Sequence, residues 1–140
     1  MVRINLINPK NLADQHLIAE YNEILMLFGY VEKHPFLEDL PKNYVLGKGH
    51  IKFFKNKLLY LKERHEKIKN EMIKRGFNPT KSVDLADFEK DMVKNWEPSK
   101  KDIQIIKTRL IEKISLKPEY YNYYGKKRIK SFFIKKINQS

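Results

Sequence analysis

The first long helix of this chain is set by residues 12–33, which read LADQHLIAEYNEILMLFGYVEK. Apolar residues recur here every three or four positions, as on the buried face of an amphipathic helix: Leu17, Tyr21, Ile24, Leu25 and Phe28. Asn11 precedes the stretch and is a suitable N-cap. We therefore expect a helix over residues 12–33 that packs on the core. The side chains expected to point away from the core are Gln15, Asn22, Glu23 and Met26, with His16 at the edge of the stripe.

Two more helices follow from the same periodicity. One is expected over residues 51–75, ending before Gly76, a typical residue just past a helix end, and its stripe is Ile51, Phe54, Leu58, Leu61, His65, Ile68 and Met72. The other is expected over residues 100–114, with the stripe Ile103, Ile106, Leu110 and Ile114. A shorter helical piece is expected within 85–95, and no segment has the period of a strand. The sequence thus predicts an all-α, single compact domain over residues 1–140 with three main helices.

Composition excludes several classes of protein. The chain has 140 residues, of which 41% are hydrophobic and 33% charged, as in a soluble globular domain. No apolar run approaches the ~18–20 residues that a membrane span needs, and no signal peptide is evident. The absence of cysteine excludes disulfides and thiolate zinc sites and favours a cytoplasmic setting. The four histidines lack metal-ligand spacing, so we expect neither a metal nor a cofactor.

The net charge of +12 indicates a polyanionic partner, and it is unevenly placed along the chain. Residues 41–78 carry 11 basic and 3 acidic side chains, and residues 100–140 carry 12 and 3. Residues 1–40, in contrast, carry 3 basic and 6 acidic side chains. Two basic blocks around an acidic segment predict a positive groove with carboxylates at one point in it. The alternative is that the lysine-rich helices are merely solvated.

The N-terminal arm, residues 1–6, leads straight into the first helix, so the α-amino group can lie near Glu23. An α-amine has a pKa of ~7.7–8.0 and a lysine one of ~10.4, so about a tenth of the former is neutral at pH 7. A neutral amine can attack an aldehyde-like carbon and form an imine. His16 lies two helical turns before Glu23 on roughly the same face.

Two further segments could contact nucleic acid. In the loop LGKGH, residues 46–50, the backbone amides of Gly47, Lys48 and Gly49 could approach a phosphate, although the full phosphate-loop pattern is absent. In YYNYYGKKR, residues 120–128, the four tyrosines cannot all be core. Their faces could stack on bases for about 1–3 kcal/mol each, while the adjoining cations take phosphates. Alternatively, two of these rings pack on the helices with their hydroxyls at the surface. Residues 129–140 form a terminal helix or a loosely held basic tail.

Six blocks in this order resemble the pyrimidine-dimer DNA glycosylase/AP lyase family: MVRINL (1–6), ADQHL (13–17), AEY (19–21), LGKGH with FF (46–54), KRGFN (74–78) and YNYYGK (121–126). The resemblance implies an all-α domain in which the N-terminal arm threads between the helices. It also implies excision of cyclobutane pyrimidine dimers followed by strand cleavage. In such enzymes the initiator methionine is removed and the new α-amine attacks C1′ of the damaged nucleotide.

Carried onto this chain, the resemblance assigns the amine to Val2 and the catalytic carboxylate to Glu23. The residues expected to line the site or contact DNA are Arg3, Gln15, His16, Asn22, Lys33, Gly47, Lys48, Gly49, Tyr120, Tyr121, Tyr123, Tyr124 and Lys126. The chain departs from the family pattern in having Val2 in place of a threonine. It also has Asn22 and Met26 in place of arginines, which weakens phosphate clamping and puts the lesion preference in question.

The expected partner is therefore double-stranded DNA that contains pyrimidine dimers or abasic sites. We expect the protein to bind it as a monomer, and we expect no membrane partner. Two rival interpretations stay open at this point. One is an AP lyase with weak or altered glycosylase specificity. The other is a damaged-DNA-binding protein without catalysis.

Overall fold

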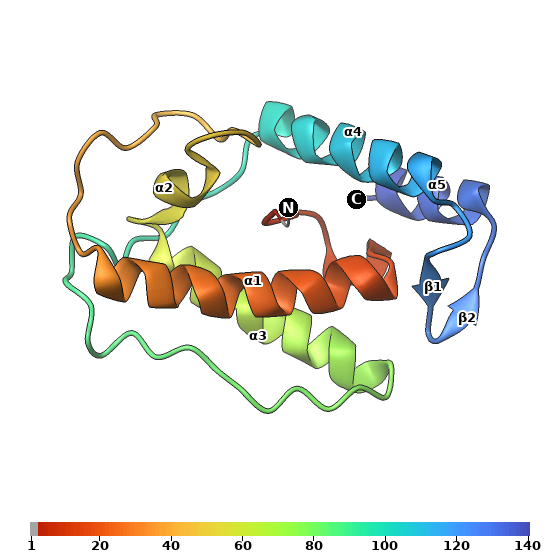
Figure 1. Cartoon of the computed structure of the whole chain (residues 1–140), viewed down its shortest axis with the longest axis horizontal. Helices are drawn as coiled ribbons and strands as arrows, with labels where there is room; N and C mark the ends of the chain where they lie inside the picture. The colour runs from red at the N-terminus through yellow and green to blue at the C-terminus, as the bar shows by residue number, and fades with distance from the viewer. Residues whose placement is uncertain (1–2) are drawn as a thin grey trace.

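The helix α1 (Asp14–Lys33) runs through the middle of the molecule and packs along α3 (Leu58–Lys74), while α4 (Lys100–Leu116) lies on the other side of the N-terminal arm (Figure 1). This computed structural model describes residues 3–140. The remaining elements are a 3-10 turn η1 (Pro9–Asn11), α2 (His50–Phe54), a hairpin of β1 (Asn122–Tyr123) and β2 (Lys126–Lys127), and α5 (Lys130–Asn138). The all-α prediction is confirmed.

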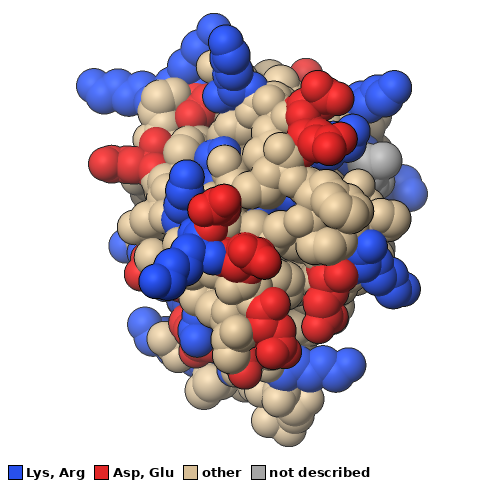
Figure 2. Space-filling model, turned by 90° about the vertical axis from the view of Figure 1, so that its left-hand side faces the viewer, with Lys and Arg blue, Asp and Glu red and all other residues tan. Residues whose placement is uncertain are grey.

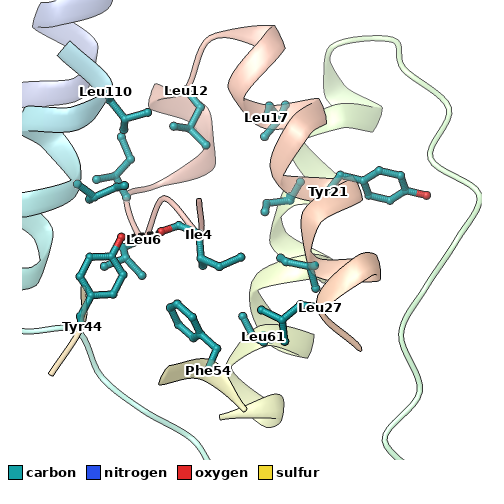
Figure 3. Close-up of a cluster of buried hydrophobic side chains, with 14 of the residues drawn as sticks. Ile4, Leu6, Leu12, Leu17, Tyr21, Leu27, Tyr44, Phe54, Leu61 and Leu110 are labelled. Atoms are coloured by element: carbon teal, nitrogen blue, oxygen red, sulfur yellow. Dashed lines mark hydrogen bonds between the residues drawn. The ribbon is translucent and has the colours of Figure 1, made fainter. Parts of the chain in front are cut away.

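The arm threads between the helices, as expected, and forms part of the core. Ile4 and Ile7 are almost fully buried, and Leu6 adopts a left-handed backbone conformation with φ 59°. Figure 3 shows Ile4 and Leu6 among apolar side chains from α1, α3 and α4. Because the apolar faces of α1, α3 and α4 share one buried cluster with Ile4, Leu6 and Ile7, the arm cannot leave without opening the core.

The expected helix over 51–75 is wrong in one respect, because it is interrupted at residues 55–57. The stripe itself is buried, apart from the half-buried Ile51. At the break, backbone groups find partners outside a continuous helix. The Leu58 amide donates to the Met92 carbonyl at 3.0 Å, while the Lys57 amide and Nζ donate to the carbonyls of Phe54 and Phe53 at 2.9 and 2.8 Å. Phe53 and Phe54 themselves lie in α2 and are buried in a cluster of rings with Tyr44 and Trp96.

Other boundaries also differ from the prediction. Residues 85–95 form turns and no helix, and α1 begins at Asp14 with Ala13, not Asn11, at its N-cap. Asn11 lies in η1 and donates a hydrogen bond to Ser140 Oγ at 2.6 Å. The face of α1 also buries Leu27 and Val31, while Leu25 is half-buried.

The C-terminal region is more ordered than the sequence indicated. Residues 130–138 form the helix α5, which buries Phe133 and Ile137 against the rest of the domain. Just before it, the unpredicted hairpin turns through Tyr124 and Gly125, both with positive φ, as the tight hairpin turn requires. The Asp14 carboxylate at the start of α1 accepts hydrogen bonds from the backbone amides of both turn residues, at 3.1 and 2.8 Å.

Two buried arginines of the α3 region bond to the backbone of residues 7–12 and join this segment to the helices. Arg64 makes two hydrogen bonds to the Glu20 carboxylate, at 2.7 and 3.0 Å, and one to the Ile7 carbonyl at 2.6 Å. Arg75 bonds to Glu71 at 2.8 Å, to Asp14 at 2.9 Å and to the backbone carbonyls of residues 9, 10 and 12. Both guanidinium groups are buried, so their charges are compensated within the fold.

Removing the Arg75 guanidinium should therefore destabilise the whole domain. We expect Arg75→Met to lower the free energy of unfolding by about 3–5 kcal/mol, because two buried carboxylates lose their counter-charge. Urea denaturation followed by circular dichroism measures the loss. The control is Lys69→Met, which removes a surface ion pair to Glu66 and should change the same free energy by less than about 1 kcal/mol. Equal losses in the two variants would contradict this account of the arm.

Candidate active site

A cavity of about 180 Å³ opens where the arm, α1, α4 and the segment before β1 meet. Its lining comprises Arg3, Asn5, His16, Ala19, Arg109, Lys113 and Tyr121. Three of these side chains are cationic and none is a carboxylate. A small concave site with this lining favours an anion such as a phosphate group.

The two arginines of the cavity come from opposite ends of the chain. Arg3 is held by a hydrogen bond from its Nε to the Leu46 carbonyl, and Arg109 is half-buried on α4. Burial lowers the pKa of Arg109, and the like charge of Arg3 lowers it further. Two neighbouring guanidinium groups repel each other, so an anion bound between them gains from both.

His16 forms the aromatic wall of the cavity with Tyr121, their ring centroids 4.8 Å apart. Burial lowers the pKa of His16 to about 4, and the charges of Arg109 and Lys113 act in the same direction. The ring is therefore neutral at pH 7. Its Nδ1 atom is buried and makes no hydrogen bond to any residue within 3–140. The neutral ring thus adds no charge to the three cations of the cavity.

Glu23 lies half-buried on α1, two helical turns beyond His16. Burial raises the pKa of its carboxyl group, and the nearby charge of Arg3 opposes that rise without cancelling it. A carboxyl group with a raised pKa is suited to proton transfer near neutral pH. Arg3 thus lies within electrostatic reach of both Glu23 and Arg109.

The other predicted site residues on α1 have different surroundings. The Gln15 amide bridges to the C-terminal segment, donating to the Tyr120 carbonyl at 3.1 Å and accepting from the Asn122 amide at 2.9 Å. Asn22 is exposed beside Glu23. Lys33 is exposed at the far end of α1, ten residues beyond Glu23, or about 15 Å along the helix axis. Lys33 is therefore not brought to the cavity.

The tyrosines divide into three kinds. Tyr121 is buried against His16, and Tyr120 is 56% exposed. Tyr123 and Tyr124 pack on the Arg75 guanidinium, at 4.5 and 5.2 Å from their ring centroids, and their hydroxyls bond to the Lys10 carbonyl and to Glu71. Two of the rings thus cover a structural arginine, which is the packing alternative raised above. Lys126, in β2, is exposed.

In the loop before α2, Gly47 and Lys48 are exposed, and Gly49 is half-buried with a positive φ of 99°. The cavity itself contains four residues that the sequence analysis did not select: Asn5, Ala19, Arg109 and Lys113. The sequence did contain a signal for two of these residues, Arg109 and Lys113. Arg109 and Lys113 are four residues apart and each precedes a core position of the predicted helix, Leu110 or Ile114, so they lie together at one edge of its buried stripe.

Several features lie away from this cavity. Four larger cavities, of about 680, 530, 460 and 440 Å³, are not lined by His16, and Glu23 lines none of these five cavities. Figure 2 shows the end of the molecule where α1 finishes, and acidic and basic side chains are interspersed there. The positive charge is thus not spread over every face.

Three further observations concern a metal site, a membrane span and the proposed nucleophilic amine. Within residues 3–140 no three His, Asp or Glu side chains are grouped so as to hold a metal ion. No described helix is long and apolar enough to cross a bilayer. Val2, the predicted nucleophile, lies outside the described residues.

The buried neutral histidines make stability depend on pH. The pKa values of His16 and His50 are each lowered to about 4 from 6.5, so the unfolded chain takes up protons first as pH falls. The free energy of unfolding should therefore fall between about pH 6.5 and 4. NMR titration of the assigned rings and urea denaturation at pH 7 and 4.5 measure both effects. His16→Gln should lose part of this pH dependence, and a His16 ring that titrates at 6.5 or above would contradict the burial argument.

A family model described as pyrimidine dimer DNA glycosylase matches residues 1–85, more than half of the chain. The match covers the arm, α1, the loop 44–50, α2 and α3, and hence Arg3, His16 and Glu23. Arg109, Lys113 and Tyr121 complete the cavity from beyond the matched range. On this evidence the chain belongs to the pyrimidine dimer DNA glycosylase family.

Proposed function

We propose that this protein excises cyclobutane pyrimidine dimers from double-stranded DNA and then cleaves the strand as an AP lyase, using the α-amine of Val2 as nucleophile. One observation carries the proposal. The carboxyl group of Glu23, with its raised pKa, lies within electrostatic reach of Arg3, the residue to which Val2 is covalently joined. The initiator methionine must be removed for this amine to exist.

The cationic cavity supports the choice of substrate. Arg3, Arg109 and Lys113 can take a backbone phosphate next to the reacting sugar, and the neutral His16 ring lines the same cavity. An enzyme that acts on a base must unstack the nucleotide and hold it outside the duplex. Phosphate contacts on one side of Glu23 would hold the strand while C1′ is exposed to the amine.

The reaction balances without a cofactor. The amine lone pair forms a bond to C1′ while the glycosidic bond breaks, and the leaving base takes its electron pair and a proton. The sugar ring opens and leaves an imine between the Val2 nitrogen and C1′. Because the imine withdraws electrons, the C2′ proton becomes acidic, and its removal expels the 3′ phosphate by β-elimination. Water then hydrolyses the imine and frees the amine.

Glu23 has two tasks in this scheme. Its carboxylate stabilises the positive charge that develops at C1′, and its protonated form can deliver a proton when the ring oxygen leaves. Partial burial serves both tasks, because it strengthens the interaction with a nearby cation and raises the pKa of the carboxyl group. Neither task involves a metal ion.

One observation favours a second candidate function, an AP lyase with weak or altered glycosylase specificity. Asn22 and Met26 are both exposed on α1 next to Glu23, and neither carries a charge. An abasic site has already lost its base, so the enzyme needs less binding energy to expose C1′ there than at an intact dimer. Loss of cations would thus reduce base excision more than strand cleavage. Under either candidate function, we expect the protein to act as a monomer and to be located at the cellular DNA.

Borohydride reduction tests the nucleophile. Incubation with a duplex that contains a pyrimidine dimer or an abasic site should give a covalent protein–DNA adduct, because borohydride converts the imine to a stable amine. Peptide mapping should locate the adduct at residue 2, and intact-mass measurement should show a chain that lacks Met1. An adduct at a lysine, or none on either duplex, would refute the proposed mechanism. Comparing the two duplexes separates the two candidate functions.

Replacing the catalytic carboxyl group should slow chemistry more than binding. We expect Glu23→Gln to lower the single-turnover rate of excision by at least about 100-fold, as is usual for loss of a proton-transfer group. Affinity for the same duplex should change by much less. The control is Glu66→Gln, which makes the same change at an exposed position of α3 and should leave the rate unaltered. Equal rates for Glu23→Gln and the wild type would remove Glu23 from the mechanism.

Restoring a cation beside Glu23 should strengthen DNA binding. Since Asn22 is exposed, Asn22→Arg can reach a phosphate, and we expect about tenfold tighter binding at low salt, or about 1.4 kcal/mol. The slope of log affinity against log salt should steepen by about 0.9 for the added contact. Ile73→Arg, at an exposed site of α3, is the control for added charge alone. An equal change in both variants would show that the effect is not local to α1.

A further inference from the structure

The loop 44–50 holds the N-terminal arm through the peptide groups of Ile4. The Ile4 amide donates a hydrogen bond to His50 Nε2 at 3.0 Å, and the Ile4 carbonyl accepts one from the Tyr44 hydroxyl at 2.9 Å. Figure 3 shows the Tyr44 ring reaching toward Ile4 across the core. All three residues are buried, so water does not compete for either bond.

The tautomer of His50 is matched to this task. Its Nδ1 lies 2.7 Å from the Val45 carbonyl oxygen, which can only accept, so Nδ1 carries the proton. Nε2 therefore presents its lone pair to the Ile4 amide. Burial lowers the pKa of His50 to about 4, so the ring is in this neutral form at pH 7.

The path of the loop accounts for its glycine. Gly49 precedes His50 with φ 99°, and a Cβ there would lie 3.0 Å from Pro41 Cγ. Any other residue would strain the turn that aims His50 at the arm. The same loop also accepts the hydrogen bond from Arg3 Nε at the Leu46 carbonyl. Residues 3 and 4 of the arm are thus each held by this loop.

We propose that His50 and Tyr44 are positioning residues, which fix the Ile4 peptide groups and so set where the Val2 amine points. This inference rests on the proposed function, because it assumes that this amine reacts. Two residues separate the amine from the held peptide, so fixing the Ile4 peptide groups limits the volume within which the amine can lie. Orientation of reacting groups is worth many powers of ten in rate, and a misplacement of about 1 Å can cost about 100-fold.

A general structural role for a buried histidine is the rival explanation, and His65 provides the comparison. His65 is as buried as His50, but its ring bonds to the Tyr21 carbonyl at 3.1 Å and stacks on the Tyr21 ring. Its described contacts are thus within the packing of α1 and α3. A variant at this position loses a buried ring and its bond without releasing the Ile4 peptide.

The test compares His50→Phe, His50→Gln and Tyr44→Phe with His65→Phe in the full chain. Two readouts are compared between the variants, and DNA affinity is measured beside them as a control. Hydrogen exchange of the Ile4 amide by NMR reports whether the arm is held. The single-turnover rate of borohydride-trapped adduct on an abasic duplex reports the chemistry, beside the dissociation constant for a duplex with a reduced, unreactive abasic analogue.

We expect His50→Phe to speed Ile4 exchange and to slow trapping by about 10-fold to 100-fold, with the dissociation constant within about threefold of the wild type. His50→Gln, which keeps a neutral acceptor, should recover most of the rate. Tyr44→Phe should show a smaller loss and serves if His50→Phe does not fold. His65→Phe should leave both readouts unchanged.

Each other outcome has a definite meaning. Faster Ile4 exchange with unchanged trapping would overturn the positioning role and leave the proposed function standing. Equal losses of trapping in the His50 and His65 variants would assign the effect to stability. Wild-type protein that forms no adduct through residue 2 would refute the proposed function, and the positioning role with it.

Discussion

The structure depends on the buried guanidinium group of Arg75. It forms ion pairs with Asp14 and Glu71 and donates hydrogen bonds to the backbone carbonyls of the η1 region. Its faces carry the rings of Tyr123 and Tyr124, and Asp14 in turn accepts hydrogen bonds from the hairpin amides. One side chain therefore joins the η1 segment, the start of α1, the end of α3 and the C-terminal hairpin. Because a buried charge is tolerated only when it is compensated, these four segments must assemble together.

The candidate site and its supporting loop combine two kinds of side chain, cationic groups and neutral histidine rings. The cavity gathers the cations of Arg3, Arg109 and Lys113, and partial burial keeps their field from being screened by water. The same field and burial keep His16 and His50 neutral, since a further positive charge there is unfavourable. Neutral rings are useful beside a polyanion, because they can accept hydrogen bonds from an amide or bond to a ligand. In the proposed function the cations supply affinity for DNA, and the neutral rings supply geometry.

Much of the fold could be predicted from local patterns. The stripes of α1, α3 and α4 are buried largely as their spacing indicated, and Gly76 has the positive φ expected just past α3. Errors arose where the reason for a structure is not local. After the break at residues 55–57 the Leu58 amide bonds to the distant Met92 carbonyl, and the hairpin at 122–127 is held by a carboxylate more than a hundred residues earlier. No pattern along the chain records such contacts.

The sequence by itself determined which residues form most of the helices, the family to which the chain belongs, and an acidic helix directly after the N-terminal arm. Periodicity and short motifs carry that information because each depends on neighbours along the chain. Only the tertiary structure decided that Arg109 and Lys113 line one cavity with Arg3, and that His50 bonds to the Ile4 amide. These relations depend on how helices cross and on which charges burial brings together, and such distances arise only when the core closes.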